Sequence, residues 1–253
     1  MDFVYYVAGI GFLALAKAKH VLRGYATPKP IDPADVDRCV SYDRAIADTY
    51  LGMADVRGKH VLELGPGSDL GVGILLIKAG AASYTAVDRH ALAGPLATAI
   101  HDAMGGRPKE VDYVVCEDFQ FAPRLERRFD IAFSNAAFEH FDDVPDVARQ
   151  LRKVMAPGGR ICVSIDLQTH SRWIREKDPA NIYRYPRWLY RLFYFPGQPN
   201  RVRPSEYRRA FESAGFTDVS TSATARLPVK GRFHSTFDPT DLDHMTVALR
   251  ATM

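Results

Sequence analysis

Residues 60–73, HVLELGPGSDLGVG, decide the fold of this 253-residue chain. The apolar residues within 61–64 are typical of the end of a buried strand, and turn formers follow them directly. Gly65 and Gly67 allow the backbone to bend sharply and to approach a ligand that a Cβ atom would obstruct. An apolar helix is predicted over residues 70–79. A strand, a glycine turn and a helix in this order predict a crevice of the nucleotide-binding type.

Two acids beside this turn indicate the kind of cofactor. A second predicted strand, residues 83–87, ends at Asp88, which lies 23 residues after Gly65. An acid at about that distance can accept hydrogen bonds from both ribose hydroxyls of a cofactor. Glu63 faces the crevice, where it could hold an ammonium group but would repel a pyrophosphate. Because Asp69 also stands where a dinucleotide fingerprint has its third glycine, the pattern favours a cofactor that carries an amino acid over NAD.

Short motifs follow each other along the chain in a characteristic order: ELGPGS (63–68), AVD (86–88), CEDF (116–119), FDIAFSNAAFEHF (129–141), LRKVMAPGGRI (151–161) and EYRRAFESAGF (206–216). In these motifs the sequence resembles the class I S-adenosylmethionine (SAM)-dependent methyltransferases, in particular small-molecule enzymes of the type 11-like kind. The resemblance implies an α/β fold with a Rossmann-like, doubly wound, mostly parallel seven-stranded sheet and helices on both faces. We expect the sixth strand over residues 217–225 and an antiparallel seventh strand over residues 244–250.

The resemblance also implies a set of cofactor contacts around the glycine turn. An acid that ends the third predicted strand would accept a hydrogen bond from the adenine amine; of Glu117 and Asp118 we favour Asp118, with Phe119 beside the ring. Tyr42 would contact the cofactor from the helix before the first strand, or it is ordinary packing. The expected SAM-binding residues are Tyr42, Glu63, Gly65, Pro66, Gly67, Asp88, Arg89, Asp118, Phe119 and Asn135.

Two histidines are candidate catalytic residues. Methyl transfer from a sulfonium mainly requires an aligned nucleophile and exclusion of water, but a hydroxyl acceptor also needs a base, for which histidine is suited near pH 7. His140 follows the predicted fourth strand and His170 follows the fifth, at the edge where such sheets bind substrates. A structural or shaping role is the alternative for His140. We predict no bound metal, because the match to a metal site is incomplete over Glu139, His140, Asp143 and Asp166.

An insertion over residues 167–203 differs in composition from the rest of the chain. It contains eight aromatic residues, and residues 167–209 hold nine arginines and one lysine against three acids, a net charge of +7. Because it follows the fifth strand, we expect a lid over the acceptor pocket. Its arginines could bind phosphate or carboxylate on the acceptor, or anionic lipid headgroups. The alternative is an irregular surface segment packed by its own aromatic side chains.

The N-terminal region is expected to stand apart from the catalytic domain. Residues 3–16 are uncharged and apolar, too few to span a bilayer, and the bases Lys17, Lys19 and Arg23 follow them. Two interpretations remain: a helix packed on the catalytic domain or on a partner subunit, or an interfacial anchor formed by residues 1–24. We place a helix and linker at residues 1–31 and the methyltransferase domain at residues 32–253.

The remaining elements follow from caps and breakers. Asp32 is expected to cap a helix that starts at Pro33 and reaches Ala54. Further helices are expected over residues 91–104 and 144–155. The third, fourth and fifth strands are expected over residues 112–116, 129–134 and 160–166.

Composition restricts the acceptor only in part. A hydrophobic fraction of 47% and a net charge of +3 are ordinary for a globular protein, and three cysteines without a CxxC pair indicate buried thiols in a reducing cytosol. We therefore expect a cytoplasmic, or membrane-associated, methyltransferase that acts on a small or lipid-linked polar acceptor, most simply at a hydroxyl. The alternatives are N-methylation of a small amine, an RNA methyltransferase or a non-catalytic SAM-binding protein. Nucleic acid is not an expected partner, and a homodimer could form.

Overall fold

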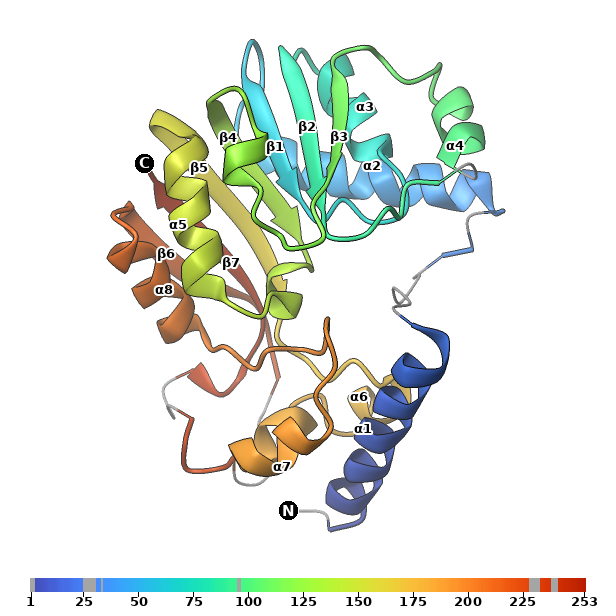
Figure 1. The fold of residues 1–253 in the computed structure, drawn as a ribbon, viewed down its shortest axis with the longest axis vertical. Helices are drawn as coiled ribbons and strands as arrows, with labels where there is room; N and C mark the ends of the chain where they lie inside the picture. The colour runs from blue at the N-terminus through green and yellow to red at the C-terminus, as the bar shows by residue number, and fades with distance from the viewer. Residues whose placement is uncertain (1–2, 25–30, 33, 95–96, 228–232, 238–240) are drawn as a thin grey trace.

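The centre of the molecule is a twisted seven-stranded sheet, with the strand order β3-β2-β1-β4-β5-β7-β6 (Figure 1). The computed structural model describes residues 3–24, 31–32, 34–94, 97–227, 233–237 and 241–253. Strands β1 to β5 pair in parallel, whereas β7 runs antiparallel to both β5 and β6, as predicted. The strands are β1 (His60–Leu64), β2 (Ser83–Asp88), β3 (Val111–Val115), β4 (Phe129–Asn135), β5 (Met155–Asp166), β6 (Thr217–Arg226) and β7 (His244–Thr252).

Helices cover both faces of the sheet, which confirms the predicted fold class. One core lies where Tyr50 of α2 and Leu76 of α3 pack on the sheet, and the other lies where Leu151 of α5 and Phe211 of α8 pack on the opposite face. Parallel strands buried on both sides need such continuous apolar runs. The helices of the sheet lobe are α2 (Val36–Met53), α3 (Gly71–Lys78), α4 (Ala97–Ala103), α5 (Val144–Val154), α8 (Pro204–Ser213) and the short η1 (Ala122–Arg124) and η2 (Phe138–His140).

Three predicted boundaries were wrong. Helix α2 is capped by Asp35, which accepts from the Arg38 N–H, because Asp32 instead closes a turn by accepting from the Ala34 N–H; Pro33 lies outside the described residues. Residues 91–94 form a loop and not the start of a helix. Strand β5 begins at Met155, five residues earlier than predicted, because the Gly158–Gly159 turn is held within the strand pairing.

A second lobe lies below the sheet in Figure 1 and combines the N-terminal helix with the insertion. It consists of α1 (Phe3–Arg23), α6 (Arg172–Arg175), η3 (Asn181–Arg184) and α7 (Arg187–Leu192). Tyr183, Tyr185 and Tyr190 form its core, against which Tyr6 and Leu13 of α1 pack. The N-terminal helix therefore packs on the insertion, a contact between segments about 175 residues apart; neither interpretation from the sequence specified this partner.

Close approach of the two segments depends on Gly9. The Asn181 amide donates to the Tyr5 carbonyl at 3.0 Å, and the Tyr185 hydroxyl donates to the Tyr6 carbonyl at 3.1 Å. A Cβ atom on Gly9 would overlap the Tyr185 hydroxyl and the Asn181 side chain, whereas nothing lies within 4 Å of the same position on Gly11. Gly9 thus has no space for a side chain, whereas Gly11 of the same helix does.

We predict that Gly9→Ala detaches α1 from the insertion, while Gly11→Ala does not. Overpacking at Gly9 should cost about 1–3 kcal/mol. Gly11→Ala should be neutral or should stabilise the helix by up to about 1 kcal/mol. Hydrogen exchange of the α1 amides measures both effects. Equal protection of α1 in the two variants would contradict the packing described above.

Candidate active site

The glycine turn after β1 forms the floor of a cleft at the carboxyl edge of the sheet. Gly65 and Gly67 have φ angles of +73° and +86°, which L-residues with side chains rarely adopt. A Cβ atom on Gly65 would lie 2.5 Å from the Cβ atom of Ala137, so the turn also needs glycine to pass the segment after β4. The cleft, called the upper cleft below, has a volume of about 530 Å³ and includes both glycines and Pro66 among its lining residues.

Two buried acids face the upper cleft. Asp88, at the end of β2, accepts from the His90 N–H at 3.0 Å, and burial raises its pKa to about 6. Glu63 is 2% exposed and accepts hydrogen bonds from the hydroxyls of Tyr50, at 2.8 Å, and Tyr84. Burial raises the pKa of Glu63 to about 7, against the effect of these two hydrogen bonds. The cleft therefore carries carboxylates where a cation would be stabilised.

The other predicted cofactor residues also line the upper cleft. Asp118 does so while Glu117 does not, which agrees with the favoured register; the Asp118 carboxylate pairs with Arg124 at 3.3 Å. Arg89 lines the cleft but is tied to Asp142 at 3.1 Å. Tyr42 lines the cleft and is 40% exposed. Tyr42, Phe119 and Asn135 thus lie where the resemblance expects them, and their contacts with the cofactor stay predictions.

Sequence reasoning missed one acid in the cleft. Asp43, on α2, is buried beside Asp69, and burial together with the Asp69 carboxylate raises its pKa. Its Oδ2 atom has no hydrogen-bond partner among the described residues. Asp69 accepts from the Gly71 N–H at 2.9 Å, which explains why an acid can replace the third glycine at the start of α3. The sequence could have indicated Asp43, because it directly follows Tyr42, the one residue of this helix that was predicted to contact the cofactor.

The two candidate histidines lie side by side where β4 and β5 end. His140 closes η2, and its ring centroid is 4.8 Å from that of His170, with the rings nearly perpendicular. The Nδ1 atom of His140 is 2.6 Å from the Gly197 carbonyl, and that of His170 is 2.9 Å from the Gln168 carbonyl. Because a carbonyl can only accept, each Nδ1 donates and each neutral ring keeps its lone pair on Nε2. Burial lowers the pKa of both imidazoles, that of His140 to about 4.

A buried carboxyl group completes this cluster. The Nε2 atom of His170 lies 4.0 Å from Oε1 of Glu139, whose side chain is 2% exposed. Neither carboxyl oxygen of Glu139 has a hydrogen-bond partner among the described residues, and burial raises its pKa well above the usual range. The three side chains, Glu139, His140 and His170, are called the junction cluster below. Asp143 and Asp166 are not part of it, because Asp143 caps α5 and Asp166 pairs with Arg175 at 2.8 Å.

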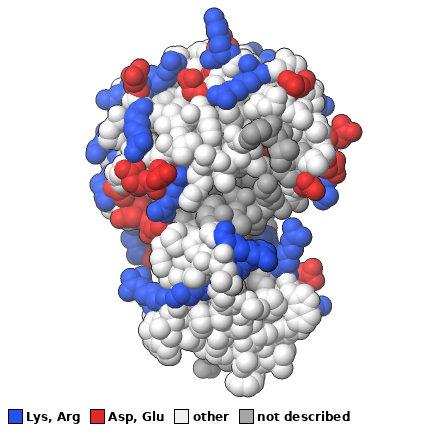
Figure 2. All heavy atoms as spheres, turned by 45° about the vertical axis from the view of Figure 1, so that its right-hand side comes forward, with Lys and Arg blue, Asp and Glu red and all other residues white. Residues whose placement is uncertain are grey.

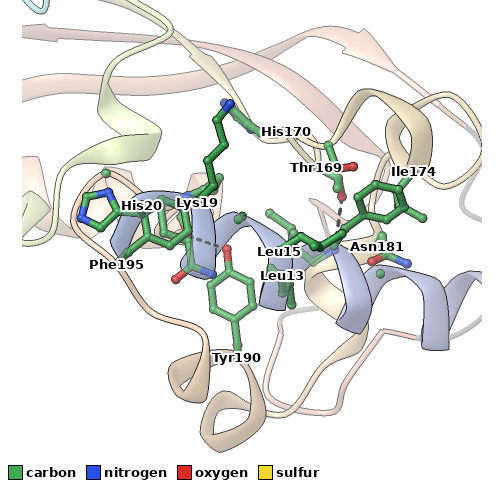
Figure 3. A pocket seen from close by; sticks show the side chains of 18 of the residues that line it. Leu13, Leu15, Lys19, His20, Thr169, His170, Ile174, Asn181, Tyr190 and Phe195 are labelled. Atoms are coloured by element: carbon green, nitrogen blue, oxygen red, sulfur yellow. Dashed lines mark hydrogen bonds between the residues drawn. The ribbon is translucent and has the colours of Figure 1, made fainter. Parts of the chain in front are cut away.

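The junction cluster stands between the upper cleft and a second cavity. This lower cavity has a volume of about 370 Å³ and lies between α1 and the insertion (Figure 3). His140, His170 and Gly197 line both spaces, so the cavities share one wall. Apolar side chains dominate the lower cavity: Phe12, Leu13, Leu15, Ile174, Tyr190 and Phe195. Sequence reasoning placed a lid here but missed the contribution of α1.

Three of the seven arginines in residues 167–203 are used inside the lower lobe, whereas Arg172 and Arg175 line the upper cleft. Arg184 pairs with Asp178 at 2.6 Å, and both are buried. Arg203 is 1% exposed and pairs with Asp241 at 3.2 Å. Arg201 donates to the carbonyls of residues 182 and 185 and lies over the Tyr190 ring. These three side chains therefore stabilise the lobe and do not face an acceptor, which corrects part of the expectation from their charge.

Comparison with known proteins identifies the family to which this chain belongs. A family model described as a methyltransferase domain matches residues 41–221. A malonyl-[acyl-carrier protein] O-methyltransferase from Halorhodospira halophila is 26% identical over 159 residues, which cover 59% of this chain and 52% of that protein. The matched region thus spans about half the length of that curated relative.

Solved structures share the fold at low sequence identity. A candidate O-methyltransferase from Nostoc punctiforme superposes with a TM-score of 0.56 at 16% identity, covering 99% of this chain and 71% of the other. A SAM-dependent methyltransferase from Mesorhizobium loti gives a TM-score of 0.51 at 17% identity, covering 86% of this chain and all of the other (100%).

We predict that Asp88→Ala weakens SAM binding by about 1.5–3 kcal/mol, the range for hydrogen bonds to a charged group. Calorimetry measures the affinity, and Asp112→Ala, which removes an exposed acid of the neighbouring strand β3, is the matched control. Because protonation removes the acceptor charge, wild-type affinity should fall as the pH drops through about 7 and 6, the pKa values of Glu63 and Asp88. Unchanged affinity in Asp88→Ala would contradict the role of this acid.

Proposed function

We propose that this chain, which belongs to the methyltransferase-domain family and uses SAM, methylates a hydroxyl group on an acceptor whose apolar part occupies the lower cavity. The cofactor would occupy the upper cleft, with its methyl group directed at the junction cluster. The observation that carries the proposal is the shared wall of the two cavities, formed by His140, His170 and Gly197. An acceptor held below this wall would present one end to the cofactor above it.

The chemical character of the junction cluster supports a hydroxyl. Both imidazoles keep a lone pair on Nε2, because their Nδ1 atoms donate to the Gly197 and Gln168 carbonyls. Such atoms favour an acceptor that brings a hydrogen, such as a hydroxyl, over an ionised carboxylate, which has none. A neutral amine would also bring a hydrogen, so N-methylation is the second outcome that product analysis must separate.

The transfer itself needs positioning and the loss of one proton. The acceptor hydroxyl gives up its proton at the junction cluster. Its oxygen forms a bond to the methyl carbon as the bond from that carbon to sulfur breaks, and the electron pair stays on the sulfur of S-adenosylhomocysteine. Alignment of oxygen, carbon and sulfur in a site closed to water supplies most of the advantage.

The lining of the lower cavity supports an apolar or lipid-linked acceptor. Its apolar wall comes from two segments: Leu13 belongs to α1, and Ile174 and Tyr190 belong to the insertion (Figure 3). Pockets of this size hold ligands through such walls, with few polar groups to fix orientation. The similarity to a malonyl-[acyl-carrier protein] O-methyltransferase is consistent with oxygen as the methylated atom, although the free oxygen of a malonyl group is a carboxyl oxygen and not an alcohol. RNA methylation is less well supported, because Arg184, Arg201 and Arg203 are engaged inside the lobe.

The outer surface of the lower lobe supports contact with an anionic membrane. Thirteen large apolar side chains are exposed among the described residues, and ten of them lie on α1 or the insertion, which exceeds the scatter of an ordinary surface. Figure 2 shows this lobe as broadly uncharged, with Lys and Arg gathered along its border with the sheet lobe. Among the described residues, no helix is long and apolar enough to cross a bilayer. The ten residues are Phe3, Val4, Val7, Leu15, Val21, Leu22, Trp173, Trp188, Leu192 and Tyr194.

We predict that Ala16→Phe, which fills the lower cavity, abolishes methyl transfer while SAM affinity stays within about twofold of wild type. Incubation with methyl-labelled SAM and fractionated cell extract measures the label in lipids, small molecules and RNA. Ala14→Phe on the exposed face of α1 is the matched control and should leave labelling unchanged. Label in RNA, or equal labelling by the two variants, would contradict the proposed acceptor site.

We predict that the protein floats with anionic vesicles and not with neutral ones, and that added salt weakens this binding. Leu22→Ser and Trp188→Ser remove side chains that are 83% and 65% exposed, and each should weaken binding by about 1.5–3 kcal/mol. Leu51→Ser on the sheet lobe is the control. If sedimentation shows that the protein forms a dimer through this face in the absence of vesicles, the partner of this surface is a second copy of the chain and not a membrane.

A further inference from the structure

We propose that the junction cluster of Glu139, His140 and His170 binds a divalent transition-metal ion, with Zn²⁺ as the simplest fit. This rests on the proposed function only for the role of the ion, since the coordination itself depends on the geometry of the three side chains. One carboxyl oxygen and two imidazole nitrogens all lie within 4.8 Å of one another. The sequence match had pointed to Asp143 and Asp166 as partners of Glu139 and His140, whereas the structure brings His170 to them instead.

The orientation of both histidines is that of metal ligands. A ligating imidazole usually donates its second ring N–H to a carbonyl or carboxylate, which fixes the tautomer and the ring plane. His140 and His170 do this through Nδ1, to the Gly197 and Gln168 carbonyls at 2.6 and 2.9 Å. Both Nε2 lone pairs are thereby available to a ligand, and that of His170 lies 4.0 Å from Oε1 of Glu139.

Glu139 supplies the independent observation. Its side chain is 2% exposed, and both of its oxygens lack a hydrogen-bond partner among the described residues. A buried polar group without a partner is unfavourable, and buried carboxyl groups in proteins are normally paired or bound to a metal. Oε1 lies 4.0 Å from Nε2 of His170, too far for a hydrogen bond between them. A shared cation would satisfy the carboxyl group and both nitrogens at once.

The spacing suits a small ion after a modest closure. Bonds of about 2.0–2.1 Å in a tetrahedron place ligand atoms about 3.3 Å apart, so the cluster is roughly 1 Å too open. Rotation about side-chain bonds of Glu139 covers such a distance. Three protein ligands with a fourth position open are typical of catalytic zinc sites, including those with two histidines and one glutamate.

The donor types select the metal. Imidazole nitrogen suits zinc and its neighbours in the first transition row, while Mg²⁺ and Ca²⁺ prefer oxygen ligands throughout. Asp166 cannot readily add an oxygen, because its carboxylate pairs with Arg175 at 2.8 Å and accepts from the Gln168 N–H. We therefore expect Zn²⁺ or Co²⁺ to bind and Mg²⁺ not to compete.

The position of the site gives the ion a role in the proposed reaction. His140 and His170 line both cavities and Glu139 lies buried behind them, so an open coordination position on the cavity side would be within reach of an acceptor hydroxyl. Coordination to a divalent cation lowers the pKa of a hydroxyl group. In that case the imidazoles act as ligands, and the hydroxyl proton passes to the carboxyl oxygen of Glu139 that does not bind the ion.

Metal binding is measured on the untagged protein, which is dialysed against a chelator, loaded with Zn²⁺ and freed of excess ion by gel filtration. We expect one Zn²⁺ per chain by elemental analysis, and visible absorption of low-symmetry Co²⁺ when Co²⁺ is added. Glu139→Gln and His170→Gln keep side-chain volume and should each lower Zn²⁺ affinity at least tenfold, with SAM affinity as the test of folding. His234→Ala, which removes a histidine from outside the cluster and both cavities, should bind Zn²⁺ like wild type.

The outcomes separate this inference from the proposed function. Stoichiometric binding that both cluster variants lose supports the site. Binding that persists in both variants, or no binding by wild type, overturns it, and methyl transfer that continues after chelation would then assign proton removal to a histidine. Zn²⁺ binding without methylation of any hydroxyl would leave the metal site in place and refute the acceptor proposal.

Discussion

The parallel pairing of β4 with β5 is the constraint on which the site depends. Asn135 lies opposite Ser164 in this pairing, so both strands run out at the same edge of the sheet. The chain that leaves β4 and the chain that leaves β5 must then occupy one small region, and they deliver His140 and His170 to it. The glycine turn after β1 ends at the same edge, where Gly65 allows it to pass against Ala137. Cofactor cleft and junction cluster are thus adjacent because three parallel strands end together.

The lower lobe shows how an insertion, residues 167–203, with seven arginines and one lysine against two acids can enclose an apolar cavity. Its buried arginines serve the fold: Arg184 and Arg203 have carboxylate partners, and Arg201 binds backbone carbonyls. Removing one partner of a buried ion pair typically costs about 3–5 kcal/mol, because the remaining charge is left without compensation. Formal charge in the sequence therefore overstates what the lobe offers to a ligand. The side chains that line the lower cavity are mainly aliphatic and aromatic, which is why the acceptor proposal depends on shape and apolar contact.

Sequence reasoning predicted the features that local patterns determine. The strand, glycine turn and acid at Asp88 depend on contacts within about thirty residues, and their spacing is restricted by the parallel βαβ unit. The strand register left Glu117 and Asp118 both open as the adenine contact, and Asp118, the favoured residue, is the one that lines the cleft. Contacts between distant segments could not be predicted. The sequence shows Glu139 as a carboxyl group beside a histidine, but only the structure shows that its oxygens lack a hydrogen-bond partner among the described residues and that His170 lies next to it. Asp35 rather than Asp32 as the cap of α2 is a smaller case, in which two equivalent residues compete and only the backbone turn decides.

Helix α1 is the clearest example of a pattern that sequence alone leaves ambiguous. Gly9, Leu13, Ala16 and His20 follow helical spacing and line the lower cavity, which is the usual pattern of a buried face. The pattern was hidden because the opposite face is apolar as well, with Val7 and Leu22 exposed. The two faces have different neighbours: one packs on the insertion at Gly9, and the other is exposed on the surface of the molecule. Deleting the helix would open the cavity and remove the outer surface together. Acceptor binding and membrane contact can therefore be separated only by substitutions confined to one face.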